Sequence, residues 1–523
     1  MNSPRRSSLS AKRVAVGPEE RFPMKRELAP TGIQGLDDVL GGGLTQNRMY
    51  LIMGDPGVGK TTLGLHFLLE GRRQGERVLY VALSETKEEI EAVAASHGWS
   101  LEGIEIFEYS AASRLDDSDE TTLFHPSEVE LGEATRTMLN AVERVQPHRV
   151  VIDSLAEVRL LAQNPLRYRR QILGLKHYFS GKKSTVLLLD DKDVASGDMQ
   201  LLTLAHGVLL LEQLAPVYGS ERRRMRVSKL RGVKYRGGFH DVTIRTGGLV
   251  VFPRLVAAEH KPSPKRGCLE SGIAAIDSLV GGGLDRGTST LLMGPAGSGK
   301  SALASQYAMA AAQRGENVAM FLFDESKNTL LARCEGIGMP FQQEIDSGRI
   351  AIQQIDPAEV PPGEFVQLVR EQVEKRNITV LVIDSLNGYV NAMPEERFLT
   401  IHMHELLTYL GQHGVATILV VAQHGLVGNS MMSPVDVSYL ADCVILLRYF
   451  ELSGEIRKAV SVVKKRSGAH EKAIRPFAIS SEGLMVGPPL TEFHGVLSGT
   501  PLLDTNLATL MSFGDRVAAG KSQ

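Results

Sequence analysis

Short runs of aliphatic residues alternate along the chain with longer segments in which apolar residues recur at helical spacing. The run RVVIDSL (149–155) is followed by the amphipathic segment RYRRQILGLKHYF (167–179) and then by the apolar run STVLLLD (184–190). Short apolar strands joined by helices are typical of a mostly parallel sheet covered on both faces. The pattern therefore predicts an α/β fold with mostly parallel sheets flanked by helices.

The same order of segments occurs twice. TGIQGLDDVLGGGLTQNRMYLIMGDPGVGKTTL (31–63) aligns with SGIAAIDSLVGGGLDRGTSTLLMGPAGSGKSAL (271–303) at an offset of 240 residues. Further along, RVVIDSL aligns with VLVIDSL at an offset of 231, so the second half is nine residues shorter in between. In the first half, that region holds the acidic, Ser-rich AASRLDDSDETTLFHPSE (111–128), which indicates a surface loop. The repeat predicts two domains of one architecture.

Composition sets the domain boundaries. The opening segment is polar, and AAEHKPSPKRG (257–267), rich in Pro and charge, lies just before the repeat restarts. We therefore expect a flexible N-terminal tail, a first domain, a linker, a second domain and a C-terminal tail. Their bounds are 1–22, 23–256, 257–266, 267–500 and 501–523.

Charge and cysteine content exclude several classes of protein. The chain has 523 residues, a formal net charge of −2 and 43% hydrophobic residues, so neither pervasive disorder nor a global attraction to nucleic acid is expected. No apolar run approaches the roughly 18 residues of a membrane-spanning helix. Three distant cysteines without a C-x-x-C pair argue against a disulfide framework or a zinc site. These features favour a cytoplasmic protein with no membrane partner.

Two segments match the pattern G-x-x-x-x-G-K-[ST], from Gly54 to Thr61 and from Gly294 to Ser301. Each lies between an apolar run and a helical pattern, the context in which backbone N–H groups hold phosphate oxygens and the Lys reaches the β and γ phosphates. No guanine-specific N-K-x-D or T-K-x-D motif is present, so ATP is the expected nucleotide. The expected nucleotide-binding residues of these loops are Gly57, Gly59, Lys60, Thr61, Thr62, Gly297, Gly299, Lys300, Ser301 and Ala302.

Magnesium and catalysis need further polar groups. The hydroxyls of Thr61 and Ser301 are expected to bind Mg²⁺ together with Asp153 and Asp384, which end equivalent apolar runs. Each Asp has an alternative role as a helix N-cap.

Acidic residues also follow another apolar run in each half, in YVALSET (80–86) and FLFDES (321–326). We expect Glu85 in the first half, and Asp324 and Glu325 in the second, to orient or deprotonate the nucleophile. The alternative is a solvated carboxylate at the end of a strand.

Together these motifs resemble the KaiC family of tandem RecA-type ATPases. The resemblance rests on GIQGLDDVLGGGL, DES, VIDSL, KLRGVKYRGGFHDVTI (229–244), KKRSGAHEKAIRPFAIS (464–480) and PLTEFHGVLSGTP (489–501), and it covers about Thr31 to Pro501. It implies a double-layered homo-hexamer with ATP between neighbouring subunits and slow ATPase activity in both layers. It also implies autokinase chemistry in the C-terminal layer, and a KaiB-like or signalling protein as partner.

The resemblance also assigns residues. Lys229, Arg231, Lys464 and Arg466 are implied to reach the γ phosphate of a neighbour's nucleotide. The family's adjacent Ser-Thr phosphoacceptor pair falls on Ser438 and Tyr439, so Ser438 is the implied phosphoacceptor. The first half departs from the family's pair of catalytic glutamates, because Ser84 precedes Glu85.

A basic stretch leaves other functions open. ERRRMRVSKLRGVKYRGG (221–238) carries eight Lys or Arg against one Glu, and it predicts a strand with one positive face. It is open to interpretation as a solvated edge strand or as the DNA contact of a RecA-like motor. Only Tyr235 and Phe239 are available there for base stacking, so nucleic acid is the less favoured partner. A scaffold assembled by ATP without kinase chemistry is a further alternative.

Overall fold

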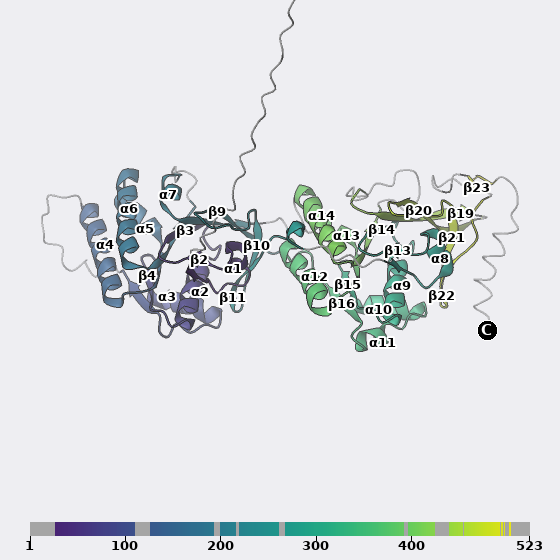
Figure 1. The fold of residues 1–523 in the computed structure, drawn as a ribbon, viewed down its shortest axis with the longest axis horizontal. Coiled ribbons are helices and arrows are strands. Elements are labelled where there is room, and N and C mark those ends of the chain that lie inside the picture. Colours follow the sequence, from purple (N-terminus) through teal and green to yellow (C-terminus); the bar gives the residue numbers. More distant parts are fainter. Residues whose placement is uncertain are drawn as a thin grey trace, which may run out of the picture.

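Two domains with the same sheet topology follow one another along the chain (Figure 1). The computed structural model describes residues 27–109, 126–192, 199–215, 219–260, 267–391, 396–423, 439–452, 454–491, 493–494, 496 and 502–503.

The strands of the first half are β1 (Leu28–Ala29), β2 (Leu44–Thr45), β3 (Met49–Gly54), β4 (Val78–Ala82), β5 (Glu105–Glu108), β6 (Arg149–Asp153), β7 (Thr185–Asp191), β8 (Gly207–Leu214), β9 (Arg222–Leu230), β10 (His240–Arg245) and β11 (Gly248–Phe252). Its helices are α1 (Leu36–Leu40), α2 (Lys60–Arg73), α3 (Lys87–Ser96), α4 (Pro126–Val145), α5 (Leu155–Ala162), α6 (Pro165–Lys182), α7 (Met199–Leu204) and the short 3₁₀ helix η2 (Ala257–Glu259).

The strands of the second half are β12 (Cys268–Leu269), β13 (Leu284–Asp285), β14 (Ser289–Gly294), β15 (Val318–Leu322), β16 (Ile350–Gln354), β17 (Val380–Asp384), β18 (Ala416–Ala422), β19 (Cys443–Leu452), β20 (Glu455–Lys465), β21 (Arg475–Ser480), β22 (Gly483–Val486), β23 (Phe493–His494) and β24 (Leu502–Leu503). Its helices are α8 (Ala274–Leu279), α9 (Lys300–Gln313), α10 (Lys327–Gly336), α11 (Phe341–Asp346), α12 (Pro362–Arg376), α13 (Leu386–Asn391) and α14 (Glu396–Gln412).

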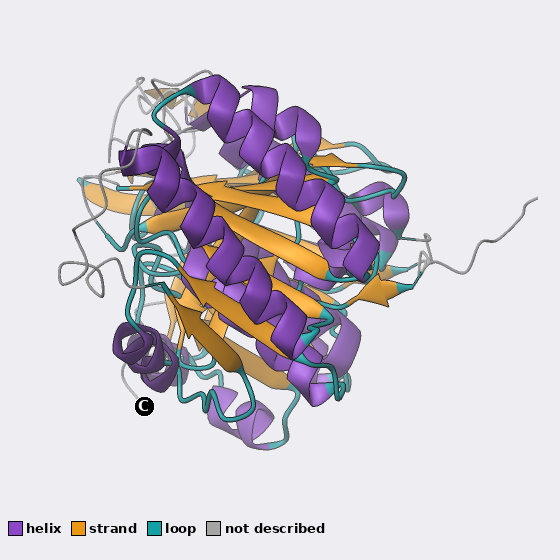
Figure 2. Ribbon diagram, turned by 90° about the vertical axis from the view of Figure 1, so that its left-hand side faces the viewer, coloured by secondary structure: helices purple, strands orange, loops and turns teal. Residues whose placement is uncertain are grey.

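Each domain is built on a nine-stranded sheet with one strand order. The order is β5-β4-β6-β7-β3-β8-β9-β10-β11 in the first domain and β16-β15-β17-β18-β14-β19-β20-β21-β22 in the second. The first six strands of each sheet are parallel and the last three are antiparallel. Figure 2 shows helices on both faces of the strands. The predicted fold class, tandem α/β domains with mostly parallel sheets, is confirmed.

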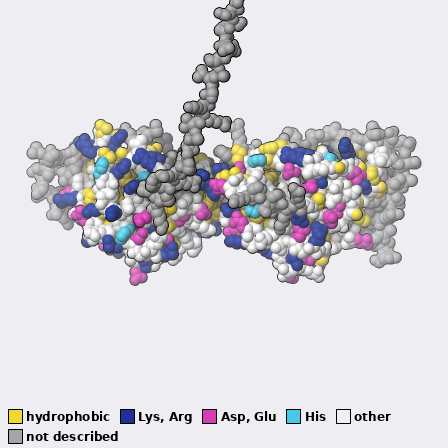
Figure 3. All heavy atoms as spheres, viewed as in Figure 1, with side chains coloured by type: hydrophobic (Ala, Val, Ile, Leu, Met, Phe, Trp, Pro, Cys, Tyr) yellow, Lys and Arg dark blue, Asp and Glu magenta, His cyan; other side chains and the backbone are white. Residues whose placement is uncertain are grey.

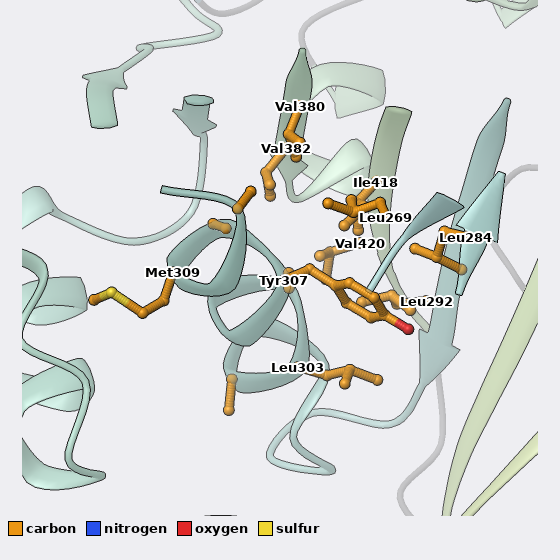
Figure 4. Close-up of a cluster of buried hydrophobic side chains, with 14 of the residues drawn as sticks. Leu269, Leu284, Leu292, Leu303, Tyr307, Met309, Val380, Val382, Ile418 and Val420 are labelled. Carbon is orange, nitrogen blue, oxygen red and sulfur yellow. The ribbon is translucent and has the colours of Figure 1, made fainter. Parts of the chain in front are cut away.

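Apolar side chains fill both faces of each sheet. In the second domain, one core lies between the sheet and α9, and another lies under α12, α13 and α14. Figure 4 shows part of the former, with Tyr307 projecting from α9 toward the strands that carry Leu284 and Leu292. Burying a Leu side chain contributes about 1.5–3 kcal/mol. Both faces of the central strands are covered, which is why their sequences are unbroken apolar runs.

The basic stretch forms β9, as predicted, but β9 is not an edge strand. It pairs antiparallel with β8 on one side and with β10 on the other. The interpretation as a solvated edge strand is therefore wrong, because the sheet continues for two more strands beyond it. The charges of this stretch also have partners inside the protein: Arg224 pairs with Glu212 at 2.9 Å and lies over the ring of Phe239.

The antiparallel end of the first sheet contacts helices of the second domain. The backbone N–H of Gly363, at the start of α12, donates to Asp241 Oδ2 at 2.6 Å, and Arg222 Nη2 donates to the carbonyl of Pro357 at 2.8 Å. Arg245 pairs with Glu364 at 3.1 Å. The two domains therefore meet where β9 and β10 approach α12, near the centre of Figure 1.

The segment between the domains is structured at its start. Ala257–Glu259 forms η2, and the N–H of Ala257 donates to Glu405 Oε2 on α14 at 2.9 Å. Residues 261–266 lie outside the described residues. Beyond position 500, β24 pairs with β23. Within the described parts of the chain, no helix is long and apolar enough to cross a bilayer.

Candidate nucleotide and magnesium site

The first glycine-rich loop joins β3 to α2. Gly57 and Gly59 have φ values of 76° and 103°, which only glycine adopts without strain. They turn the chain so that α2 begins at Lys60, and the first-turn N–H groups of a helix have no carbonyl partner within it. The buried Lys60 donates from Nζ to the carbonyls of Gly54 and Asp55 at 2.9 and 3.0 Å. A cradle of this kind fits a chain of phosphates.

Lys60 also has a carboxylate partner. Its Nζ lies 2.7 Å from Asp191 Oδ1, at the end of β7, the strand beside β3. Asp191 was not among the residues singled out from the sequence. The run LLLDD that ends β7 was its only signal, because strand order is needed to show that β7 ends beside the loop.

The second glycine-rich loop joins β14 to α9 with the same backbone. Gly297 and Gly299 have φ values of 75° and 106°, and α9 begins at Lys300. Lys300 donates to the carbonyl of Pro295 at 2.8 Å. Burial lowers the pKa of Lys300 to about 8, and the charge of Asp384 opposes that shift only in part. In the first domain, Asp191 pairs with Gly54 on the neighbouring strand. The residue that pairs with Gly294 in the second domain is Ala422, so the equivalent position carries no carboxylate.

Thr62 and Ala302, the next helical residues of the two loops, are both buried. Thr62 Oγ1 lies 3.4 Å from His97 Nε2, at the end of α3. The backbone N–H is thus the group that each position has in common for a phosphate.

In the first domain, a hydroxyl and a carboxylate meet below the loop. The Thr61 hydroxyl donates to Asp153 Oδ2 at 2.7 Å, and the Tyr80 hydroxyl donates to the same oxygen at 2.6 Å. Asp153 ends β6 and is 8% exposed. A Ser/Thr hydroxyl beside a strand-end carboxylate is the oxygen donor set that suits Mg²⁺ with a nucleotide, so these residues fit the ion. Sequence reasoning missed Tyr80, which looks like one more apolar residue of a buried strand.

The second domain places Asp384 in the equivalent position, at the end of β17. Burial raises the pKa of Asp384, while a hydrogen bond from Ser301 and the charge of Arg333 lower it. Its Oδ2 is buried without a hydrogen-bond partner among the described residues. Met320 replaces Tyr80 here. A buried carboxylate oxygen without a partner is an available ligand for a cation.

Glu85 follows β4 in the first domain, close to Asp153. Burial, and then the charges of Asp153 and Glu89, raise the pKa of Glu85. Its Oε2 is buried and has no hydrogen-bond partner among the described residues. Beside it, Ser84 Oγ lies 3.3 Å from Ser154 Oγ. A carboxylate with a raised pKa and a free oxygen suits proton abstraction near neutral pH.

The corresponding acids of the second domain are both engaged. Arg333 of α10 donates to Glu325 from Nη2 at 2.9 Å and from Nε at 3.2 Å. The Ser385 hydroxyl donates to Asp324 Oδ2. Arg333 was not singled out from the sequence, where it reads as one of several charges on a helix.

The four basic residues implied to contact a neighbour's nucleotide lie far from the loop of their own domain. Lys229 pairs across the sheet with Val208, level with the start of β3, whereas the loop follows the other end of β3. Lys229 Nζ donates to the carbonyls of Leu202 and Ala205, and Arg231 donates to that of Thr203. These cations and the glycine-rich loop of the same domain therefore lie at opposite ends of strand β3.

In the second domain, Lys464 pairs with Val444 near the start of β19 and donates to the carbonyl of Ala441 at 2.8 Å. Arg466 donates to the carbonyl of Tyr439 at 2.7 Å and pairs with Asp442 at 3.2 Å. Ser438, the implied phosphoacceptor, lies outside the described residues.

Comparison with known proteins agrees with this geometry. The model of the KaiC ATPase family matches residues 29–256 and again residues 269–491. The circadian clock oscillator protein KaiC of Parasynechococcus marenigrum is 27% identical over 488 residues, which are 91% of this chain and 94% of that protein. The circadian clock protein KaiC3 of Synechocystis sp. is 25% identical, over 91% of this chain and 95% of that protein. The KaiC of Thermosynechococcus vestitus is 25% identical, over 92% and 93%. Because the family model covers both halves, the chain belongs to the KaiC family of ATPases.

Proposed function

We propose that this protein binds Mg²⁺ and ATP at both glycine-rich loops, hydrolyses ATP, and acts as an oligomeric signalling or timing switch that phosphorylates itself on Ser438. The observation that carries the proposal is the hydrogen bond from Thr61 to Asp153 beneath the first loop, with Glu85 close by. Family membership adds the expectation of an ATPase.

Residues of the first domain have separate tasks in hydrolysis. The loop amides and Lys60 would bind and orient the phosphates, while Thr61 and Asp153 would hold the metal. Bound Mg²⁺ would offset negative charge on the β and γ phosphates. Glu85 takes a proton from water as the water oxygen bonds to the γ phosphorus, and the bond from that phosphorus to the bridging oxygen of ADP breaks. The products are ADP and inorganic phosphate.

In the second domain, the Ser438 oxygen takes the place of water. It bonds to the γ phosphorus, ADP leaves with the bridging oxygen, and the hydroxyl proton passes to Asp324 or Glu325. The contact of Arg466 with the carbonyl of Tyr439 supports this proposal, since it joins an implied phosphate-contacting cation to the residue after Ser438.

The position of Lys229 and Arg231 supports a ring of subunits. These cations lie at the opposite end of the sheet from their own loop, so they reach a nucleotide only if it is bound by another subunit. We therefore propose a homo-hexamer with nucleotides between subunits, together with a KaiB-like or signalling protein as partner.

A RecA-like DNA motor is less well supported. Arg222 and Arg224 are occupied by protein carbonyls, a carboxylate and an aromatic ring. On the face drawn in Figure 3, basic side chains are interspersed with acidic ones. We expect fluorescence anisotropy with single-stranded DNA to show no binding with a steep salt dependence.

The test uses the full chain with ATP labelled in the γ phosphate. We expect released phosphate, label on the protein, and mass-spectrometric localisation of that label to Ser438, with Lys300→Ala removing the label. Light scattering should show nucleotide-dependent hexamers, weakened more by Lys60→Ala than by Lys300→Ala. Hexamers without label or released phosphate would identify an ATP-assembled scaffold and refute the proposed chemistry.

A further inference from the structure

The two candidate catalytic glutamates differ in the helix that follows them. Glu85 precedes α3 and Glu325 precedes α10, and these helices begin at equivalent positions, 87 and 327. The seventh residue of the two helices differs. It is Val93 in the first domain and Arg333 in the second.

Arg333 is held in place as well as charged. Its two hydrogen bonds to Glu325 use both carboxylate oxygens, in the fork geometry that makes Arg–carboxylate pairs specific. Both side chains are mostly buried, with relative exposures of 26% and 21%. Water therefore screens this pair less than it screens an exposed one.

The pair also lies next to the metal site. The charge of Arg333 acts on Asp384, whose Oδ2 is buried without a partner among the described residues. The Nη1 atom of Arg333 is likewise buried and has no hydrogen-bond partner in that part of the chain. The guanidinium thus has one N–H group without a partner among the described residues, and its charge acts on Asp384.

We propose that Arg333 is a positioning residue that clamps Glu325 and so restrains the second domain from activating water. This deepens the proposed function and rests on it. A carboxylate engaged by a guanidinium through both oxygens is not free to turn toward a water molecule. ATP in the second domain is then preserved from hydrolysis, and Asp324, which accepts a hydrogen bond from Ser385 and not from Arg333, remains the base for transfer to the Ser438 hydroxyl.

Activity tests use the full chain in a Glu85→Gln background, in which the remaining turnover reports on the second domain and Lys300→Ala defines zero. We expect Arg333→Val to raise phosphate release roughly threefold to tenfold. The increase should lie in kcat, with KM within about twofold, because the phosphate-binding groups are unchanged. Arg333→Lys keeps the charge without the fork, and should raise phosphate release less than Arg333→Val does.

A reciprocal variant checks the same idea in the first domain. In a Lys300→Ala background, Val93→Arg should lower phosphate release roughly threefold or more, whereas Val93→Gln, of similar length but neutral, should not. Unchanged or lower turnover in Arg333→Val would overturn the clamp. Absence of turnover in the unmodified protein would instead refute the proposed hydrolysis.

A second readout does not depend on activity. Denaturant unfolding of the parent, Arg333→Val, Glu325→Gln and the double variant forms a thermodynamic cycle for this pair. We expect the double variant to be more stable than the sum of the two single changes indicates. Additive effects would show that the two side chains do not interact in solution, and would overturn the proposal.

Discussion

The ammonium of Lys60 lies 2.7 Å from the carboxylate of Asp191, whereas Lys300, its counterpart in the second domain, donates to the carbonyl of Pro295. One P-loop lysine is therefore partnered by an anion and the other by a neutral group. Incoming phosphates would displace a carboxylate from the lysine at the first loop and a backbone carbonyl at the second. The two loops should respond differently to charge and to pH.

Replacing Asp191 with Asn should tighten the binding of Mg·ATP to the first domain roughly threefold to tenfold, because the carboxylate both competes for Lys60 and repels the phosphates. Titration with a fluorescent ATP analogue in a Lys300→Ala background measures this affinity. The matched control is Ala422→Asp in a Lys60→Ala background, which should weaken binding to the second domain. Weaker binding in Asp191→Asn would show that Asp191 assists the nucleotide.

Nucleotide binding to the second domain should take up a proton near pH 8 to 9. The pKa of Lys300 lies at about 8 in the folded chain against a usual 10.5, and bound phosphates favour the charged form. Affinity should accordingly fall as pH rises above 8. Calorimetry in two buffers of different ionisation enthalpy counts the proton, and Lys300→Ala should abolish the uptake.

The same shift affects stability without nucleotide. Because the unfolded chain binds more protons than the folded chain between about pH 8 and 10.5, the contribution of Lys300 becomes less unfavourable as pH rises through that window. Lys300→Met should remove this rise in the free energy of unfolding. At neutral pH, Lys300→Met should raise the free energy of unfolding by on the order of 2 to 4 kcal/mol.

Glu85→Gln should lower hydrolysis in the first domain about a hundredfold or more while leaving nucleotide affinity within about twofold, because the base is lost and the phosphate cradle is kept. Steady-state phosphate release in a Lys300→Ala background isolates this site. Turnover that survives unchanged would remove Glu85 from the mechanism.

Loss of the hydroxyl should have different effects at two buried tyrosines, on stability at Tyr307 and on magnesium dependence at Tyr80. Tyr307 is completely buried, and its Oη has no partner within the described residues, so Tyr307→Phe should be neutral or stabilising by about 1 kcal/mol. Tyr80 donates to Asp153, so Tyr80→Phe should weaken the dependence of nucleotide binding on Mg²⁺. Thermal unfolding and magnesium titrations distinguish them, and a destabilised Tyr307→Phe would contradict the first expectation.

Patterns local in sequence predicted much of this fold. The apolar runs of β3 and β14 and the helices after them are where the patterns placed them, because strand, glycine turn and helix are fixed by neighbouring residues. The edge assignment of β9 failed for the opposite reason. Whether a strand has one neighbour or two depends on β10, which pairs with it through the fold.

The candidate site divides in the same way. Lys60, Thr61 and Asp153 belong to motifs with recognisable spacing, so they could be named from the chain alone. Asp191 and Arg333 could not, because each acts through a partner from another element: the carboxylate at the end of β7 reaches a lysine of α2, and an arginine of α10 reaches the end of the β15 segment. The spacing of residues along the sequence does not indicate contacts between side chains of different elements.

Strand β9 contacts the second domain at one end and carries Lys229 near the other. At one end Arg222 holds the carbonyls of Pro357 and Ala358 in the second domain, and near the other Lys229 is the cation proposed to meet a neighbouring subunit's nucleotide. Nine residues of extended chain at about 3.3 Å each make a rod of roughly 30 Å, paired on both sides with other strands. A braced rod transmits displacement along its axis instead of absorbing it. In the proposed double ring, a pull on Lys229 by a neighbour's phosphate would therefore reach Pro357 of the second domain, so that β9 would couple the two domains mechanically.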